Sequence, residues 1–497
     1  MSGVRISLGG PTPLLPLNQR AMKKTDRSNE RSSNSDLTAG PITRHMARLT
    51  GFLMLSMISY NVATLVETIY IGMVGTNELA AISFTFPVVM ILQSVAFGLA
   101  VGAGSVAART VGGGDILRVK RLSTHCLLLV TVLSSLIGII AYFFLTPIFM
   151  VLGASEQVLP LIVSYLTIWL LGMPIFAMTN VGITLMRSTG DAVSPGYLSA
   201  LGALLHIGIA PFFIFGVGPF PEMGLQGAAL SFVIARFFEI LVFFYLFAVR
   251  DKMMLFGLEG FKRSIGDMLH VGLPAIAANL IVPVSMAVIT RLLAGHGTAV
   301  VAGFGVAMRI EFMTIMVIFA VSISLSPIVG QNWGAGLYDR VKVAMRTANF
   351  FVICWGVLSY LILLAFGHVF VGLINSDPLV QTAAYNYLRV GPLAVGLMGV
   401  IFNATHCFNA LGKPIPPLIL SLLRMIIIKI PVVLVGNYFF GYMGIFIGTV
   451  ITTVIVAIIS SQWVNRTIDR RIGRSLARAK ESALKARSWE TVEIETK

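Results

Sequence analysis

Apolar residues occur along this chain in twelve long runs, each separated from the next by a short polar or glycine-containing stretch. A helix needs roughly 20 apolar residues to cross a bilayer, and every run is long enough. The predicted helices span about residues 47–72, 79–108, 121–146, 157–186, 196–216, 225–249, 270–293, 299–328, 343–371, 379–408, 416–436 and 443–465. We therefore predict an all-α integral membrane protein with twelve transmembrane helices.

The same local signals appear twice, at a constant offset of 222 residues. The matched positions are Gly75-Thr76 and Gly297-Thr298, Gly112 and Gly334, Gly114 and Gly336, Arg118 and Arg340, Tyr165 and Tyr387, Gly190 and Gly412, and Pro195 and Pro417. A fixed offset over this length indicates duplication of a whole half of the chain. Each half has an even number of helices, so both enter the membrane in the same orientation. We predict two six-helix bundles related by a parallel internal repeat, as in transporters that hold cargo between their halves.

Charge is scarce and is confined largely to one set of loops. Of the 497 residues, 56% are hydrophobic and 11% are charged, whereas soluble domains carry roughly 25% charged residues. Basic residues occupy the N-terminal segment and the loops after helices 2, 4, 6, 8 and 10, and the loops on the other side contain no Lys or Arg. Since basic loops mark the cytoplasmic side, we expect a multi-pass protein of the inner, cytoplasmic membrane with both termini in the cytoplasm. This pattern accounts for the net charge of +15 without a nucleic-acid partner.

The polar segments predict the limits of the domains. Residues 1–45 are rich in Ser and Asn and are expected to form a disordered cytoplasmic tail. The N-terminal six-helix lobe is predicted over 46–249, a charged cytoplasmic linker over 250–269, and the C-terminal six-helix lobe over 270–465. The basic cytoplasmic tail, 466–497, is consistent with an amphipathic helix on an anionic membrane surface.

Several short motifs follow one another in order across both halves. They are Glu67 to Gly72 with Gly75-Thr76, Arg187 to Asp191 with Pro195, Gly224 to Leu230, Met308 to Ile310 with Val329 to Gly336, and Lys429 to Pro431. The ordered set, covering about residues 45–465, resembles the MATE (multidrug and toxic compound extrusion) transporters, and within them the subgroup with its cation site in the N-terminal half. The resemblance implies an antiporter that exports amphipathic, often cationic compounds against an inward flow of H⁺ or Na⁺.

Glu67 is the first candidate for the coupling site. A charge at the bilayer centre costs about 2.5–3.5 kcal/mol on insertion scales, so an intramembrane acid is a functional candidate by default. Glu67 lies inside the first helix without a basic residue in the neighbouring turns, and the resemblance places an Asp of the family at this position. Because a partly dry cavity favours the neutral carboxyl, Glu67 is expected to bind and release a proton. The structural alternative is a pair with a membrane arginine, or exposure near the outer end.

His206 is the second candidate. In the subgroup that the chain resembles, the fifth helix carries an Asn and, four residues later, an Asp before a proline. Aligned on Pro211, this chain has His206 and Ala210 at those positions. A histidine titrates near neutral pH, so Glu67 and His206 are predicted to form a proton-responsive pair; the alternative is a packing histidine. Sodium requires several hard oxygen ligands, so the missing carboxylate favours H⁺, with Na⁺ as the other possibility.

Asn180 on the fourth helix resembles a pocket residue of the family and is predicted to join this polar cluster, although an interhelical hydrogen bond is an equal alternative. A second intramembrane acid, Glu311, is a candidate for substrate contact or coupling. The remaining predicted substrate-binding residues, with ordinary packing as their alternative, are Asn279, Asn403, Met173, Met178, Met286 and Phe176. Methionine and phenylalanine suit an adaptable apolar pocket.

Basic residues inside the helices bear on the charge of the cargo. Arg236 and Glu239 are three residues apart and are expected to neutralise each other. The others, which either have structural roles or favour an anionic or zwitterionic cargo, are Arg291, Arg309, Arg389, Arg424 and Lys429.

Other functions are less consistent with the chain. A related lipid-linked saccharide flippase is expected to have helices beyond twelve and a strongly cationic cavity. An enzyme is not expected, because the sequence contains no nucleophile–base set, metal-ligand spacing or phosphate-binding loop. We expect no cofactor besides the coupling ion. The expected partners are small-molecule substrates and membrane lipids, and the protein is expected to be a monomer.

Overall fold

The computed structural model describes residues 36–495, and within the last helix it leaves undescribed the side chains of 478–480 and 482–495. Most of the predicted disordered tail, residues 1–35, lies outside this range. The final part of that prediction is wrong, because Leu37 is buried and the first described helix begins at Ile42.

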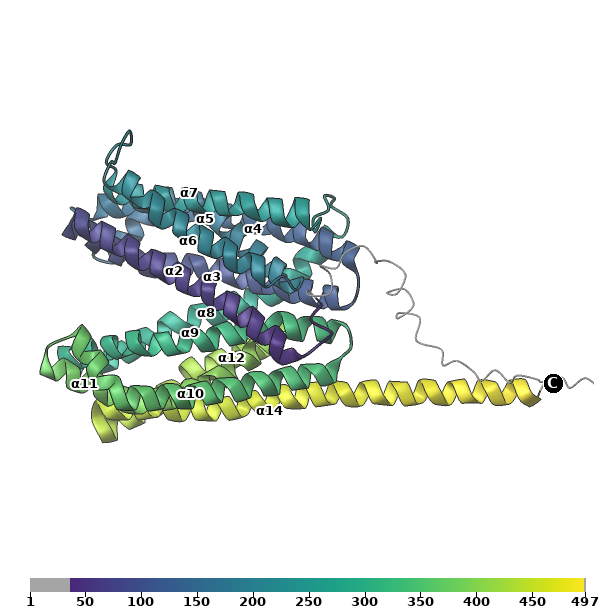
Figure 1. Cartoon of the computed structure of the whole chain (residues 1–497). Coiled ribbons are helices and arrows are strands. Elements are labelled where there is room, and N and C mark those ends of the chain that lie inside the picture. The colour runs from purple at the N-terminus through teal and green to yellow at the C-terminus, as the bar shows by residue number, and fades with distance from the viewer. Residues whose placement is uncertain (1–35, 496–497) are drawn as a thin grey trace, which may run out of the picture. The chain divides into compact units, whose positions relative to one another are not determined.

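The first half of the described chain is helical throughout, with short connections. Its helices are α2 (Ile42–Val74), α3 (Thr76–Gly112), α4 (Ile116–Val151), α5 (Leu159–Ser188), α6 (Val193–Ile214) and α7 (Gly224–Phe244), which continues as a π-helix over Tyr245–Arg250. All six are longer than the roughly 20 residues that a bilayer requires. Inside this half, α5 packs against α3, α4 and α7, and α6 packs between α2 and α7 (Figure 1).

The second half repeats the pattern. Its helices are α8 (Phe261–Ala294), α9 (Thr298–Gly334), α10 (Tyr338–Ile374), α11 (Pro378–Val390), α12 (Val395–Ala410), α13 (Ile415–Leu422) and α14 (Lys429–Glu495). A 3₁₀ turn at Gly391–Ala394 joins α11 to α12 within one apolar span, and a π-helical turn at Leu423–Ile427 lies between α13 and α14. Here α9 packs against α10, α11 and α12 (Figure 1).

The predicted all-α membrane fold is confirmed, because the described residues contain no strand and eleven helical segments are long and apolar enough to cross a membrane. The eleventh segment, Ile415–Ala477, contains both of the last two predicted helices. The division between them lies at Gly441, whose φ of 58° and ψ of −145° are not helical. Twelve spans therefore fit the eleven continuous segments.

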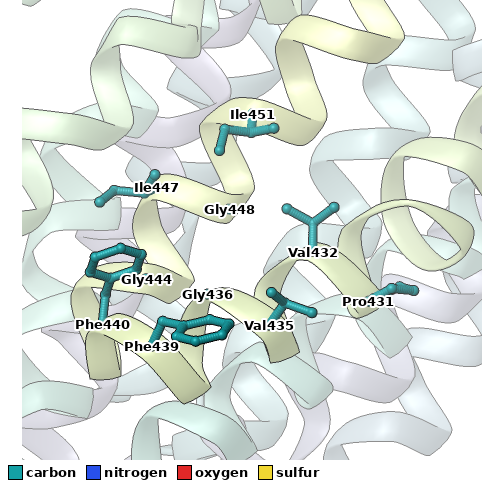
Figure 2. Close-up of a pocket in the computed structure, with 10 residues that line it drawn as sticks. All are labelled: Pro431, Val432, Val435, Gly436, Phe439, Phe440, Gly444, Ile447, Gly448 and Ile451. Atoms are coloured by element: carbon teal, nitrogen blue, oxygen red, sulfur yellow. The ribbon is translucent and has the colours of Figure 1, made fainter.

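The kink at Gly441 divides the start of α14 into two segments, which contact each other through glycines. The backbones at Gly436 and Gly444 are so close that a Cβ atom on either would collide with the other. A hollow of about 340 Å³ lies beside these two segments, and Phe439 and Phe440 in its lining are exposed. Figure 2 shows the apolar side chains that line it. An exposed apolar surface of this kind suits contact with lipid tails.

The linker between the halves is shorter than predicted. The prediction of 250–269 is corrected to 251–260, because α7 extends through its π-helix to Arg250 and α8 begins at Phe261. The start of α4 holds this connection: a ring nitrogen of His125 lies 2.7 Å from the Gly257 carbonyl oxygen, and Arg121 pairs with Glu259 at 2.7 Å.

The basic C-terminal segment continues α14 without a break as far as Glu495. Lys342 pairs with Asp469 at 2.6 Å, and the Arg471 guanidinium lies 5.5 Å from the centre of the Tyr338 ring. These contacts hold the beginning of the segment beside α10. The segment extends the last membrane helix, and its contact with an anionic membrane surface stays a prediction.

Candidate functional site

The two halves meet through hydrogen bonds near the basic loops. Arg109, near the end of α3, donates through Nη1 to the carbonyl oxygen of Ala410 at 2.9 Å. Gln331, near the end of α9, donates through Nε2 to the carbonyl oxygen of Ser188 at 2.8 Å. Each residue of the first bond is separated from its counterpart in the second by the 222-residue offset of the repeat. The contact therefore obeys the pseudo-two-fold symmetry of the duplicated chain.

Glycines at the same end obey the same symmetry. A Cβ atom on Gly112 would collide with the carbonyl oxygen of Gln331, and one on Gly334 would collide with the carbonyl oxygen of Arg109. Small residues let membrane helices approach closely. The repeated glycines of the sequence thus form a tight contact between α3 and α9.

Glu67 and His206 come together inside the first half. Glu67 lies on α2 and is 9% exposed, and His206 lies on α6 and is 4% exposed. Glu67 Oε1 and His206 Nε2 are 3.8 Å apart, which is too long for a hydrogen bond. Neither atom has another hydrogen-bond partner within the described part of the chain. Two buried polar atoms thus face each other unsatisfied, an arrangement that is uncommon in folded proteins.

The spacing of residues on α6 explains how the neighbouring helices reach this pair. Gly196 allows α2 to approach, since a Cβ atom there would crowd Phe52. Gly202 lies one turn before His206, on the same helix face, and allows the carboxylate of Glu239 on α7 to pack against it. His206 therefore lies where α2, α6 and α7 meet.

Arg236 on α7 adds a fixed positive charge beside the pair. It forms a buried ion pair with Glu239, as the three-residue spacing predicted, and Glu239 is 0% exposed. Its guanidinium lies 5.2 Å from the centre of the Phe232 ring, and the His206 ring contacts the same ring edge-to-face. Arg236 also interacts electrostatically with Glu67 and His206. The cluster has two carboxyls, one guanidinium and one imidazole, so its net charge depends on protonation.

Asn180 does not join the described contacts of this cluster. Its Nδ2 donates to the carbonyl oxygen of Phe176, one turn earlier on α5, at 2.9 Å. From the same helix, Tyr165 is buried and interacts electrostatically with Glu67. Tyr165 and Arg236 were not predicted from the sequence as neighbours of Glu67, although Tyr165 is one of the matched positions of the repeat.

The second half contains a related arrangement. Glu311 on α9 is buried and accepts a hydrogen bond from the Tyr387 hydroxyl at 2.7 Å, and Lys429 interacts with it electrostatically. Arg309 is exposed. Tyr387 is the repeat counterpart of Tyr165, so a tyrosine at equivalent positions lies near a buried carboxyl in each half. The carboxyls themselves are not equivalent, because Glu67 belongs to the first helix of its half and Glu311 to the second.

The predicted substrate-binding residues do not form one site in this structure. Met173 and Phe176 are 1% and 3% exposed and pack in the core of the first half. Met178 Sδ accepts a hydrogen bond from the Thr131 hydroxyl at 3.6 Å, which is also a packing contact.

Besides Glu311, three predicted substrate-binding residues lie in the second half. Asn279 is exposed and Met286 is half-buried, both on α8. Asn403 is buried, accepts from Ser322 at 2.7 Å and donates to Asn349 at 3.0 Å. Both ends of its amide are therefore satisfied within the protein, which supports the structural alternative for this residue.

Metal ligation is not indicated in the described residues, where no three His, Cys, Asp or Glu side chains gather closely enough to hold an ion. The chemistry available to the Glu67–His206 pair is the uptake, sharing and release of a proton.

Comparison with known proteins identifies the family. The MatE family model matches residues 53–212 and 274–435, one match in each half. The chain is 32% identical over 412 residues to the FAD transporter of Shewanella oneidensis, covering 82% of this chain and 91% of that protein. It is 24% identical over 417 residues to the multidrug export protein MepA of Staphylococcus aureus, covering 82% of this chain and 89% of that protein.

A solved structure extends the likeness to three dimensions. The Vibrio cholerae MATE transporter VcmN, in its bent form, has a TM-score of 0.82 and 26% sequence identity, covering 86% of this chain and 98% of that chain. The matches run through both halves and the relatives are transporters, not enzymes. This chain is therefore a multi-pass membrane transporter that belongs to the MatE family.

Proposed function

We propose that this transporter is a proton-coupled antiporter that exports small amphipathic molecules, and that Glu67 together with His206 carries the proton. The observation that supports this most is the 3.8 Å approach of Glu67 Oε1 and His206 Nε2, two buried atoms without other partners. An unpaired buried group costs about 1–3 kcal/mol. Such a cost is understandable if the pair changes its bonding during each transport cycle.

Protonation of Glu67 would change the net charge of the buried cluster that it forms with His206, Arg236 and Glu239. Glu67 is buried, and the nearby Arg236 interacts with it electrostatically. Glu239 is already paired with Arg236, so Glu67 is the group whose charge can change at the smallest cost. When Glu67 is ionised and His206 is protonated, the two attract; when either loses its charge, the contact loosens. The gain or loss of one proton thus changes the strength of the contact between α2 and α6.

The contacts between the halves provide the second part of the proposed cycle. The hydrogen bonds of Arg109 and Gln331 gather at the end that carries the basic loops. With that end proposed to be cytoplasmic, these contacts support the proposal of a state closed to the cytoplasm. A proton that binds from outside would change the contact between α2 and α6, and the cargo would then be released. A potential of 100 mV supplies roughly 2.3 kcal/mol for each charge moved, so proton entry can drive uphill export.

The relatives suggest the range of cargo. One is an FAD transporter and another a multidrug export protein, so we propose ring-bearing small molecules, whether metabolites or drugs. The proposed location is the inner, cytoplasmic membrane with both termini in the cytoplasm. The proposed working unit is a monomer in contact with membrane lipids, with H⁺ as the coupling ion and no cofactor.

Transport by the purified chain in liposomes tests this function. Ethidium and flavin mononucleotide serve as a cationic and an anionic cargo, and each is assayed under a proton gradient without Na⁺ and under a Na⁺ gradient without a pH difference. We expect concentrative movement of at least one cargo under the proton gradient only, and its loss when an ionophore collapses that gradient. Movement driven by Na⁺ alone, or by neither ion, would contradict the proposal.

A further inference from the structure

Two basic side chains of the second half lie inside the membrane without an acidic partner. Arg424 is in the π-helical turn Leu423–Ile427, and Lys429 begins α14 directly after it. In the described residues neither forms an ion pair, and the buried Nε of Arg424 has no hydrogen-bond partner. A buried donor that is left unpaired requires an explanation.

The π-helical turn brings these two charges to one side. The amide of Ile428 bonds to the carbonyl oxygen of Leu423, five residues earlier, which is the π-helical pattern. Residues five apart, such as Arg424 and Lys429, are therefore about one turn apart on the same face. The two cations interact electrostatically and unfavourably with each other. Single π-turns in helices occur frequently at functional sites.

The depth of the two residues excludes an ordinary contact with water at the membrane surface. With a rise of about 1.5 Å per residue, Arg424 lies about 14 Å and Lys429 about 21 Å along the path from the start of α13 at Ile415. The hydrocarbon core is about 30 Å thick. Basic residues at this depth are rare and face the interior of the bundle, a partner or a water-filled pathway.

The available acid does not neutralise both cations. Glu311 interacts with Lys429 electrostatically, but no ion pair forms between them, and its Oε2 is already bonded by the Tyr387 hydroxyl. Arg424, Lys429 and Glu311 together leave an excess of positive charge. In the first half the balance is opposite, since Arg236 faces both Glu67 and Glu239.

Aromatic rings lie beside the cations. The Arg424 guanidinium is 5.0 Å from the centre of the Phe402 ring, and Phe402 stacks on Phe319 with centroids 4.5 Å apart. Both rings border the apolar cluster that Phe52 of α2 also contacts. The Arg424 guanidinium and the two stacked rings are therefore neighbours within the second half.

We propose that Arg424 and Lys429, with the Phe319–Phe402 stack, form a binding site for an aromatic organic anion that carries a phosphate or carboxylate group. Arg binds such groups with two parallel hydrogen bonds, and Lys adds a point charge. The rings contribute offset or edge contacts with an aromatic cargo. The site rests on the proposed function in that it defines the charge of the exported molecule, but it does not depend on which ion drives export.

Equilibrium binding without any ion gradient tests this site independently of coupling. The full chain in phosphatidylcholine nanodiscs is titrated against flavin mononucleotide and against riboflavin, which share one ring system and differ by a phosphate; flavin fluorescence reports binding. We expect the wild-type protein to prefer flavin mononucleotide. Arg424→Gln and Lys429→Gln should each weaken that binding at least about tenfold, the value expected for one charge-assisted hydrogen bond, with little effect on riboflavin.

The matched controls are Arg346→Gln, which removes an exposed basic residue of the same half, and Arg424→Lys, which retains the charge. The first should bind like the wild type, and the second should lose less affinity than Arg424→Gln. Equal affinity of the wild type for both flavins would overturn the proposal. So would displacement of flavin mononucleotide by added phosphatidylglycerol, since the site would then hold a lipid headgroup. If Arg424→Gln fails to fold, the flavin pair and Lys429→Gln still decide.

Discussion

Glu67→Gln is expected to abolish proton-driven export while leaving exchange of cargo down its own gradient intact. Glutamine has nearly the same size as glutamate, so the packing between α2 and α6 should be preserved. The amide cannot take up a proton at any pH reached in the experiment. Coupling that depends on protonation of this side chain is therefore lost, whereas the movement between the two access states is retained. Uptake into liposomes with and without a proton gradient measures both.

Two other carboxyls of the chain provide matched controls for this result. Glu156→Gln removes an exposed carboxyl from a loop, and Glu311→Gln removes the buried carboxyl of the second half while keeping an acceptor for the Tyr387 hydroxyl. Both variants should remain proton-driven. If Glu311→Gln loses coupling and Glu67→Gln keeps it, the proton site lies in the second half and the account is wrong.

Arg236→Met is expected to destabilise the folded protein strongly. The substitution leaves Glu239 fully buried without a partner and removes the positive charge near Glu67. Removing one member of a buried ion pair costs about 3–5 kcal/mol because the other charge stays buried and unpaired. Thermal unfolding of the purified protein in detergent should show a clear decrease in midpoint, and the yield of monodisperse protein should fall.

Replacement of both charges should restore much of the lost stability. In Arg236→Met with Glu239→Leu, no unpaired charge remains at this ion pair, and apolar pairs of similar volume are often as stable as the ions they replace. Arg309→Met, at an exposed position, should leave the midpoint near the wild-type value. A double variant as unstable as Arg236→Met would show that Arg236 is needed for contacts other than the ion pair, such as those with Phe232 and Tyr60.

The helices and the repeat could be predicted because they depend on local or periodic properties of the chain. The length of each apolar run is set by the bilayer, and a fixed offset persists wherever a duplicated half keeps its turns. The spacing of Arg236 and Glu239 on one helix was also sufficient to predict their ion pair. The approach of Glu67 to His206 was predicted from the family resemblance, because hydropathy alone does not show which helices are neighbours.

Features that depend on helix rotation or on tertiary packing could not be predicted. Met173 and Phe176 suited an adaptable pocket by residue type, but α5 turns both into the core. The position of Arg236 beside Glu67 depends on Gly196 and Gly202 of α6. Because these residues have no side chains, α2 and α7 can both pack closely against α6. The π-helical turn at Arg424 has no recognisable signal in the residues that form it.

The structure also changes the meaning of the duplication. Tyr165 and Tyr387 are repeat counterparts near buried carboxyls, but those carboxyls come from different helices of their halves. The interface of Arg109 and Gln331 retains the symmetry of the repeat, whereas the charged interiors do not. We propose that the duplicated scaffold contains two different sites, a proton site in the first half and an anion site in the second.

Infrared difference spectroscopy of the purified chain during acidification tests the central claim most directly, because it observes protonation of a buried carboxyl without requiring a known cargo. The account predicts a carboxyl C=O band in the wild-type protein that grows as the pH falls from alkaline to mildly acidic. The band should be absent in Glu67→Gln and shifted in frequency in His206→Asn, and it should persist in Glu311→Gln. A difference spectrum of Glu67→Gln identical to that of the wild type would contradict the assignment of the proton to Glu67.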